Sequence, residues 1–260
     1  MNGLGPNEIT MCNSLYSGIE KKEFWAYDSN IKQYAGYKIE DKNSTSIKKI
    51  RQNEKLYAAV ELVHTSDSTI MTKLAVGNDM FVEFSTKADT INKFGNWKWL
   101  LDNKQPDYFN FKILQGRLNS SKDRNLFTLS GVVKDYIELL NKDSGKIVSI
   151  RGPFNENPEY SVKTISGYEM PVFKQDTKTN YPQTFIGEES IFALFFEKPN
   201  HEVFGVDDSE INIFEFDLEG NPLTNYIITY PIISFTVNED LRKIYGISSD
   251  KNPNIVEFNY

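Results

Sequence analysis

The chain has 260 residues, 39% of them hydrophobic, and carries 36 acidic against 29 basic side chains, for a formal charge of -7. This length and hydrophobic content exclude a disordered chain and allow one large all-β domain, which we expect over residues 1–260. The negative charge, with lysines scattered along the chain, disfavours a nucleic-acid partner.

The first residues, MNGLGPNEIT, contain neither the basic nor the apolar region of a secretory signal. The longest apolar runs are short, such as IFALFF at 191–196, whereas a membrane-spanning helix needs roughly 18 apolar residues. Cys12 is the only cysteine, which excludes an internal disulfide. Aromatic residues make up 13% of the chain, and pleated, half-buried strands favour them. We therefore expect a β-rich chain without a transmembrane segment.

One pattern recurs along the chain: two apolar positions bracket a polar or small one, and a turn rich in Asp, Asn, Ser or Gly follows. The copies are EFWAYDSNIKQY at 23–34, MFVEFSTKADTINKF at 80–94, YIELLNKDSGKIVSI at 136–150, NIFEFDLEGNPLTNY at 212–226 and NIVEFNY at 254–260. Such alternation before a turn predicts a half-buried strand entering a hairpin. Residues 132–142 also have helical spacing, but we assign them to a strand because their neighbours are strands.

The copies recur on the scale of a structural repeat. If Tyr27, Phe84, Leu140, Phe216 and Phe258 are equivalent, the intervals are 57, 56, 76 and 42 residues. A period of about 40–50 residues, with four short strands in each, is typical of β-propeller blades, which bury their faces by stacking on one another. We predict a β-propeller of four-stranded antiparallel blades, with an insertion in the long third interval.

Several stretches carry motifs of a known family. They are SIFALFF at 190–196, FDLEGNP at 216–222, IYGIS at 244–248, IVEF at 255–258 and, near the start, GLGPNEI at 3–9. These stretches resemble the TolB-like six-bladed β-propellers of bacterial cell-envelope lipoproteins. The resemblance implies a TolB-like propeller of five to six blades in the periplasm or cell envelope. It also implies a signal, a lipid-attachment cysteine and the rest of a first blade before residue 1, so we expect a shortened N-terminus or fewer blades.

The densest aromatic region is formed by NWKWLLD at 96–102 and PDYFNFKI at 106–113. Two interpretations remain open for Trp97, Trp99 and Tyr108. Large aromatic side chains of this kind pack between blades. Near loops they also serve as anchors for protein, peptide or glycan partners, and His64 would then belong to the same binding surface.

The histidines, His64 and His201, are too few for a three-histidine zinc site. An alternative places His64 with Glu188 and Glu189 at a channel mouth, where they would bind a divalent cation such as calcium, as in lactonase-like propellers. That arrangement would support a metal-dependent hydrolase or lactonase acting in the central channel.

Other catalytic motifs are missing from the sequence. No acidic cluster has calcium-loop spacing, no serine lies in a G-x-S-x-G elbow, and GLGP lacks the Lys-Ser/Thr ending of a phosphate-binding loop. We therefore expect no catalytic residues and no resident cofactor. Our interpretation is a non-catalytic binding or scaffold propeller of the bacterial envelope, with an unknown protein, peptide or glycan partner.

Overall fold

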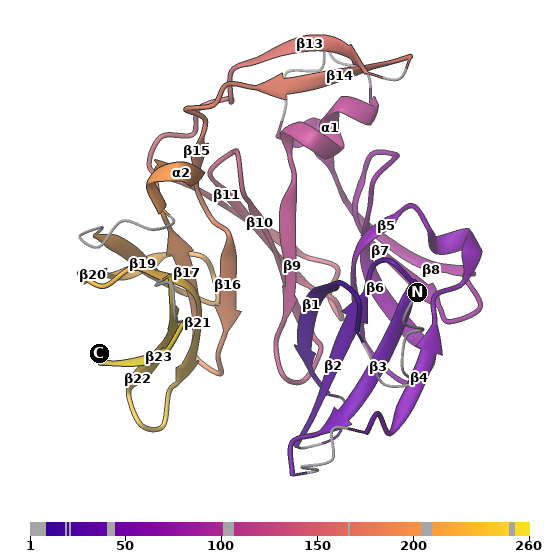
Figure 1. Ribbon diagram of the computed structural model, residues 1–260, viewed down its shortest axis with the longest axis horizontal. Coiled ribbons are helices and arrows are strands. Elements are labelled where there is room, and N and C mark those ends of the chain that lie inside the picture. The colour runs from indigo at the N-terminus through magenta and orange to yellow at the C-terminus, as the bar shows by residue number, and fades with distance from the viewer. Residues whose placement is uncertain are drawn as a thin grey trace. The chain divides into compact units, whose positions relative to one another are not determined.

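The computed structural model of the protein describes residues 9–18, 20, 22–40, 45–100, 107–165, 167–203, 210–249 and 253–260. The chain forms two compact units, Met1–Gly95 and Asn96–Tyr260. Both are built almost wholly from antiparallel strands (Figure 1). The expectation of a single domain over residues 1–260 stays a prediction.

The first unit contains two four-stranded sheets in which consecutive strands pair. The first sheet comprises β1 (Cys12–Ser17), β2 (Glu23–Asp28), β3 (Gln33–Lys38) and β4 (Lys48–Arg51). The 3-10 helix η1 (Glu54–Leu56) follows it. The second sheet comprises β5 (Ala59–His64), β6 (Thr69–Leu74), β7 (Asp79–Ser85) and β8 (Thr90–Asn96).

The second unit contains three further sheets. The third sheet comprises four strands: β9 (Gly116–Ser120), β10 (Leu126–Gly131), β11 (Tyr136–Asn141) and β12 (Ile147–Arg151). The fourth sheet also comprises four: β16 (Gln183–Ile186), β17 (Ser190–Phe195), β19 (Ile211–Asp217) and β20 (Pro222–Ile228). The fifth sheet has three: β21 (Ile232–Asn238), β22 (Lys243–Ser248) and β23 (Ile255–Asn259).

Short elements complete the second unit. The 3-10 helix η2 (Trp97–Trp99) and helix α1 (Asp107–Ile113) precede the third sheet. A two-stranded hairpin, β13 (Tyr160–Ile165) and β14 (Tyr168–Phe173), follows it. Strands β15 (Lys178–Thr179) and β18 (Lys198–Pro199) pair beside helix α2 (Asn200–Val203). In the part of the chain that the structure describes, no helix has the length and hydropathy needed to cross a membrane.

The sheets confirm the all-β fold and the antiparallel blades of a TolB-like propeller. The described residues form four sheets of four strands, one of three and two of two strands. Residues 136–141 are strand β11, as assigned, and the β13–β14 hairpin lies in the long third interval, where we expected an insertion. Four of the five anchors lie in the third strand of their sheet, but Tyr27 lies in the second strand, β2. The glycine-rich stretch at 3–8 lies outside the described residues.

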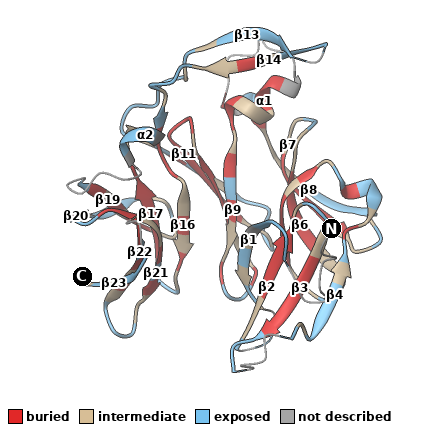
Figure 2. Cartoon of the chain, viewed as in Figure 1, coloured by how far each residue is buried: buried red, intermediate tan, exposed pale blue. Residues whose placement is uncertain are grey.

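Strand β17 shows why a strand of this fold can consist of apolar residues without alternation. All six of its residues are buried, and successive side chains of a strand point to opposite faces. Ile191, Ala193 and Phe195 join a cluster that includes Ile137 and Leu139 of the third sheet, whereas Phe192 and Leu194 join a cluster that includes Phe235 and Ile244 of the fifth sheet. The fourth sheet is therefore covered on both faces, and burial is concentrated in its inner strands (Figure 2).

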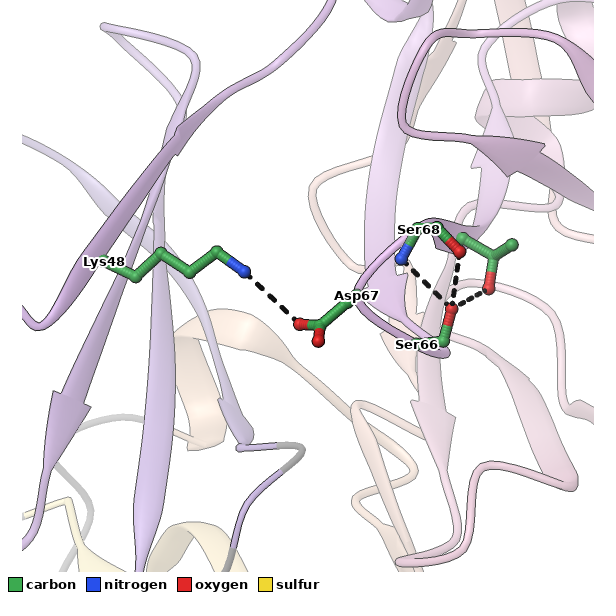
Figure 3. A network of polar contacts seen from close by, with 5 residues as sticks. Lys48, Ser66, Asp67 and Ser68 are labelled. Atoms are coloured by element: carbon green, nitrogen blue, oxygen red, sulfur yellow. Dashed lines mark hydrogen bonds and ion pairs between the residues drawn. The ribbon is translucent and has the colours of Figure 1, made fainter.

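The first and second sheets also pack against each other through buried side chains. Trp25, Tyr27 and Tyr34 of the first sheet share a buried cluster with Leu62 and Val82 of the second. An exposed ion pair adds a peripheral contact, since Lys48 Nζ on β4 lies 3.3 Å from Asp67 Oδ1 in the β5–β6 turn (Figure 3). Exposed pairs of this kind contribute at most about 1 kcal/mol, so the buried cluster contributes most of the stability of this contact.

Candidate functional site

A cavity of about 1140 Å³ opens in the second unit, among the turns of three sheets. Its lining comes from the β9–β10 and β11–β12 turns of the third sheet, the β16–β17 and β19–β20 turns of the fourth, and the β21–β22 turn of the fifth. In a sheet of sequential antiparallel strands the chain reverses at each turn, so the first and third turns fall at the same end. Stacking three such sheets therefore gathers five turns around one space.

One carboxylate joins a turn of the fifth sheet to a turn of the fourth at the wall of the cavity. Glu239, in the β21–β22 turn, accepts hydrogen bonds from the backbone N–H groups of Glu188 at 2.7 Å and Glu189 at 3.4 Å. A Cβ at the preceding residue, Gly187, would overlap this carboxylate. Glycine at this position therefore leaves room for the Glu239 carboxylate, which a larger residue would displace.

The other turns are stabilised by their own polar side chains. In the β9–β10 turn the Ser121 hydroxyl donates to the Asp123 carboxylate, which also accepts from the backbone N–H of Asn125 at 3.2 Å. The hydrogen bond from Ser121 is the main cause of the lowered pKa of Asp123. Asn141 Oδ1 accepts from the backbone N–H of Ser144 at 3.0 Å in the β11–β12 turn. Such side-chain bonds to local backbone hold a turn in one conformation.

The rim of the cavity is acidic. Its lining contains six carboxylates, of Asp123, Glu188, Glu189, Glu219, Glu239 and Asp240, against two lysines, Lys122 and Lys146. Four of these acidic residues, Glu188, Glu189, Glu219 and Asp240, are exposed. Their carboxylates make no hydrogen bond or ion pair with the described part of the chain. This rim therefore presents uncompensated negative charge.

The lining also contains an apolar surface. Leu126, Val148, Phe185 and Leu218 are partly exposed and pack at the edges of two buried clusters, one shared by the third and fourth sheets and one shared by the fourth and fifth. Leu139, Ile186 and Val237 lie buried beside them. A cavity that combines apolar side chains with a few convergent polar groups has the usual character of a ligand site.

The candidate metal ligands are divided between the two units. Glu188 and Glu189 lie side by side in the β16–β17 turn of the second unit, at the rim of the cavity. His64 ends β5 in the first unit and is only 6% exposed. Its ring lies 4.8 Å from the ring of Tyr34 and 5.5 Å from that of Trp25. Among the residues that the structure describes, no three His, Cys, Asp or Glu side chains form a group that could hold a metal ion.

The aromatic candidates lie in η2 and α1. Trp97 is 1% exposed, and its ring packs edge-to-face on that of Tyr136 at 6.4 Å. Asn96 caps η2, since its Oδ1 accepts from the backbone N–H of Lys98 at 2.9 Å. The burial of Trp97 favours the packing interpretation for this residue. The side chains of Trp99 and Tyr108 lie outside the described part of the structure.

Most residues of the cavity could not be recognised as site residues from the sequence alone. Leu218 and Glu219 lie in the turn of FDLEGNP, and Asp240 lies in the β21–β22 turn, but turn carboxylates are usually solvated. One signal could have found them. Turns at equivalent positions of a repeat lie at the same end of their sheets, so acidic residues recurring in those turns are candidates for one surface.

The comparisons with known proteins agree with this architecture. A sequence profile of the TolB-like 6-blade propeller-like family matches residues 1–240. No curated protein matches the sequence well enough to count as a relative. Among solved structures, the chain is similar to a member of the DUF4221 family from Bacteroides vulgatus, with a TM-score of 0.55 and 10% identity over 99% of this chain and 81% of that chain.

Two further structures are similar at low identity. One is a protein from Bacteroides fragilis assigned as exported, with a TM-score of 0.52 and 11% identity over 95% of this chain and 68% of that one. The other is hydrazine synthase from Kuenenia stuttgartiensis, with a TM-score of 0.47 and 8% identity over 94% of this chain and 65% of that one. At such identities, the likeness to the two Bacteroides proteins is one of fold alone. The profile match, which covers most of the sequence, shows that the chain belongs to the TolB-like 6-blade propeller-like family.

Proposed function

We propose that the protein is a non-catalytic β-propeller of the bacterial cell envelope, which binds or scaffolds a protein, peptide or glycan partner in the cavity among the turns of its third, fourth and fifth sheets. The observation that carries this proposal is the cavity itself, about 1140 Å³ in volume and lined by five turns of three sheets. This volume lies just above the usual range of pockets for single small molecules, about 300–1,000 Å³, which suits a segment of a larger partner.

The construction of the walls supports a binding role. The β16–β17 turn is tied to the β21–β22 turn through Glu239, and the β9–β10 and β11–β12 turns are closed by Ser121, Asp123 and Asn141. Turns held in this way lose little conformational freedom when a ligand arrives, so more of the interaction free energy is retained as affinity.

The location in the periplasm or envelope is supported by resemblance. TolB-like propellers occur in envelope lipoproteins, and the similar protein from Bacteroides fragilis is assigned as exported. Fractionation of cells that express the full gene product at its natural level tests the location. We expect the protein in the envelope or periplasmic fraction, and its recovery with cytoplasmic markers would contradict this part of the proposal.

The binding role is tested by selecting ligands from a peptide display library and a glycan array on the whole chain. The blocking variant is Glu219→Trp, because Glu219 is an exposed rim residue and an indole there would cover the apolar lining. The matched control is Leu223→Trp, since Leu223 lies on β20 of the same hairpin, is 55% exposed and is not part of the lining.

Selected ligands should bind Leu223→Trp as they bind the unsubstituted protein. They should lose about ten-fold or more in affinity for Glu219→Trp, because part of the contact surface is covered. Ligands that bind both variants equally would place recognition elsewhere, and failure to select any ligand would count against a binding role for the cavity.

A further inference from the structure

The unpaired charge of the cavity is arranged asymmetrically. Its four unpaired carboxylates, Glu188, Glu189, Glu219 and Asp240, all belong to turns of the fourth and fifth sheets, whereas both lysines, Lys122 and Lys146, belong to turns of the third. Asp123 is the one carboxylate that the third sheet contributes to the described part of the lining, and it already accepts hydrogen bonds within its own turn. A cationic group would therefore be attracted to one side of the cavity, beside the fourth and fifth sheets.

The same side is poorly suited to an anion. Backbone N–H groups in turns commonly bind anions. Here those of Glu188 and Glu189 already donate to the Glu239 carboxylate. Among the described residues, no arginine or lysine from the fourth or fifth sheet is part of the lining. The electrostatic preference for a cation thus comes both from the unpaired carboxylates and from the occupied donors.

Apolar side chains accompany the carboxylates in these turns. Leu218 directly precedes Glu219, and Phe185 lies at the end of β16 close to Glu188 in the chain; both apolar side chains are partly exposed in the lining. Lysine and arginine combine an apolar stem with a charged head, and they place the stem along apolar surface. A bare metal ion or an inorganic cation would leave the apolar part of the lining uncovered.

We infer that the ligand of this cavity is a basic peptide segment, whose lysine or arginine heads face the carboxylates of Glu188, Glu189, Glu219 and Asp240 while their stems and neighbouring apolar side chains cover Leu218 and Phe185. This inference rests on the proposed binding function and specifies its ligand class. The volume of the cavity, about 1140 Å³, accommodates several residues of an extended chain.

The inference is tested by fluorescence anisotropy of the whole chain with three short fluorescein-labelled peptides. The first alternates lysine and leucine, the second glutamate and leucine, and the third lysine and serine. The lysine–leucine peptide should bind at least about ten-fold more tightly than either of the others, because it alone supplies both charge and apolar surface. Its affinity should fall as salt is raised, since the rim charges are exposed and become screened.

Matched charge variants locate the binding. Glu188→Gln combined with Glu219→Gln removes two rim charges, and Glu54→Gln combined with Glu169→Gln removes two exposed charges that are not part of the lining. Both pairs change the net charge equally. The rim pair should weaken the lysine–leucine peptide about five-fold, as expected for two exposed charge contacts, and the control pair should leave its affinity unchanged.

The apolar contact is tested in the same assay. Leu218→Ser should weaken binding of the lysine–leucine peptide, whereas Leu223→Ser, on the same hairpin but outside the lining, should not. Circular dichroism of each variant at the assay temperature confirms that it is folded before its affinity is compared.

The alternative outcomes separate this inference from the proposed function. Equal effects of the two charge pairs, or preferred binding of the glutamate–leucine peptide, would overturn the cationic class. If binding of the preferred peptide is lost in Glu219→Trp and kept in Leu223→Trp, the cavity is still a binding site and the proposed function stands. Absence of binding by all three peptides would also overturn the inference, and the library selection then decides the proposed function independently.

Discussion

The Glu239 carboxylate accepts a hydrogen bond from the backbone N–H of Glu188 at 2.7 Å. These residues lie 51 positions apart in the sequence, in the β21–β22 and β16–β17 turns. Hydrogen bonds to charged groups contribute more to stability than neutral ones. This contact therefore joins the fifth sheet to the fourth at the rim of the cavity.

The first prediction concerns that contact. Gly187→Ala should displace the Glu239 side chain, because the new methyl group would overlap its carboxylate, and Glu239→Ala removes the acceptor directly. Each variant should lower the free energy of unfolding by about 1 kcal/mol, the usual contribution of such a bond at a partly exposed position. Urea denaturation followed by circular dichroism measures both.

A double-mutant cycle provides the control. If the methyl group acts by displacing the carboxylate, Gly187→Ala should cost little once Glu239 is alanine, so the two effects should be strongly non-additive. Asp240→Asn, at the neighbouring exposed position, should leave the midpoint of urea denaturation unchanged. Additive effects of Gly187→Ala and Glu239→Ala would show that the glycine is needed for another reason.

The second prediction concerns the contact between the third and fourth sheets. Gly220, in the β19–β20 turn, has φ +87, and a Cβ there would lie 2.8 Å from Cγ1 of Val148 on β12. Gly220→Ala therefore combines a left-handed backbone, which costs about 1–2 kcal/mol for alanine, with overpacking against the neighbouring sheet. We expect a total loss of about 2–4 kcal/mol in the free energy of unfolding.

Gly77 supplies the matched control. It has φ +90, but a Cβ there would meet nothing within 4 Å. Gly77→Ala should therefore show the backbone cost alone. Equal losses for the two variants would mean that the turn and β12 separate without cost, and would argue against tight packing of the third and fourth sheets.

The third prediction concerns an ion pair between a buried carboxylate and a partly exposed guanidinium. Arg151 Nη1 lies 2.6 Å from Oε1 of Glu138, whose side chain is fully buried, and Ser149 donates a second hydrogen bond to the same carboxylate at 2.6 Å. Burial raises the pKa of Glu138 despite these partners. Arg151→Met should lower the free energy of unfolding by about 2–4 kcal/mol at neutral pH, because it leaves a buried carboxylate without its cation.

The pH dependence of this variant has a definite sign. A carboxyl whose pKa is raised in the folded state contributes stability below its unfolded pKa, about 4.3, and loses that contribution as the pH rises through the folded value. Arg151→Met should therefore gain stability relative to the unsubstituted protein as the pH is lowered from 7 toward 5. Adding Glu138→Leu should remove this pH dependence, and its persistence in the double variant would assign it to another group.

The fourth prediction concerns Asp28 at the end of β2. Its Oδ2 accepts from the backbone N–H of Thr10 at 2.6 Å, and its Oδ1 accepts from the backbone N–H of Asn30 at 2.9 Å. Burial acts to raise the pKa of this carboxyl, but the hydrogen bonds outweigh it and the pKa lies below its ordinary value. Asp28→Asn should cost about 1–2 kcal/mol at neutral pH.

A carboxyl group whose pKa is lowered in the folded state stabilises the fold at pH values above its unfolded-state pKa, about 3.9. That contribution is lost as the pH falls through its folded-state pKa. The difference between the unsubstituted protein and Asp28→Asn should therefore be constant from pH 7 to 5 and shrink below about pH 4. Asp67→Asn, at a largely exposed side chain, should show no comparable change. A difference that grows in acid would contradict the hydrogen-bonding account.

Much of the architecture follows from local pattern. The alternation in NIFEFD and the turn residues of LEGN predict the hairpin of β19 and β20. Alternation has a period of two residues, which belongs to the strand itself, and turn chemistry is also local. The sequence by itself therefore determines where strands and turns lie and indicates the class of fold.

Only the tertiary structure decides which turns meet. The joining of Glu239 to the backbone of Glu188 and the gathering of five turns around one cavity depend on how sheets stack, which no short stretch encodes. The same applies to Trp97 and His64, whose residue types suit either a core or a binding surface and which stacking has buried. Burial and convergence arise from long-range packing, whereas periodicity arises from the strand, and this is the physical reason that the fold could be predicted and the site could not.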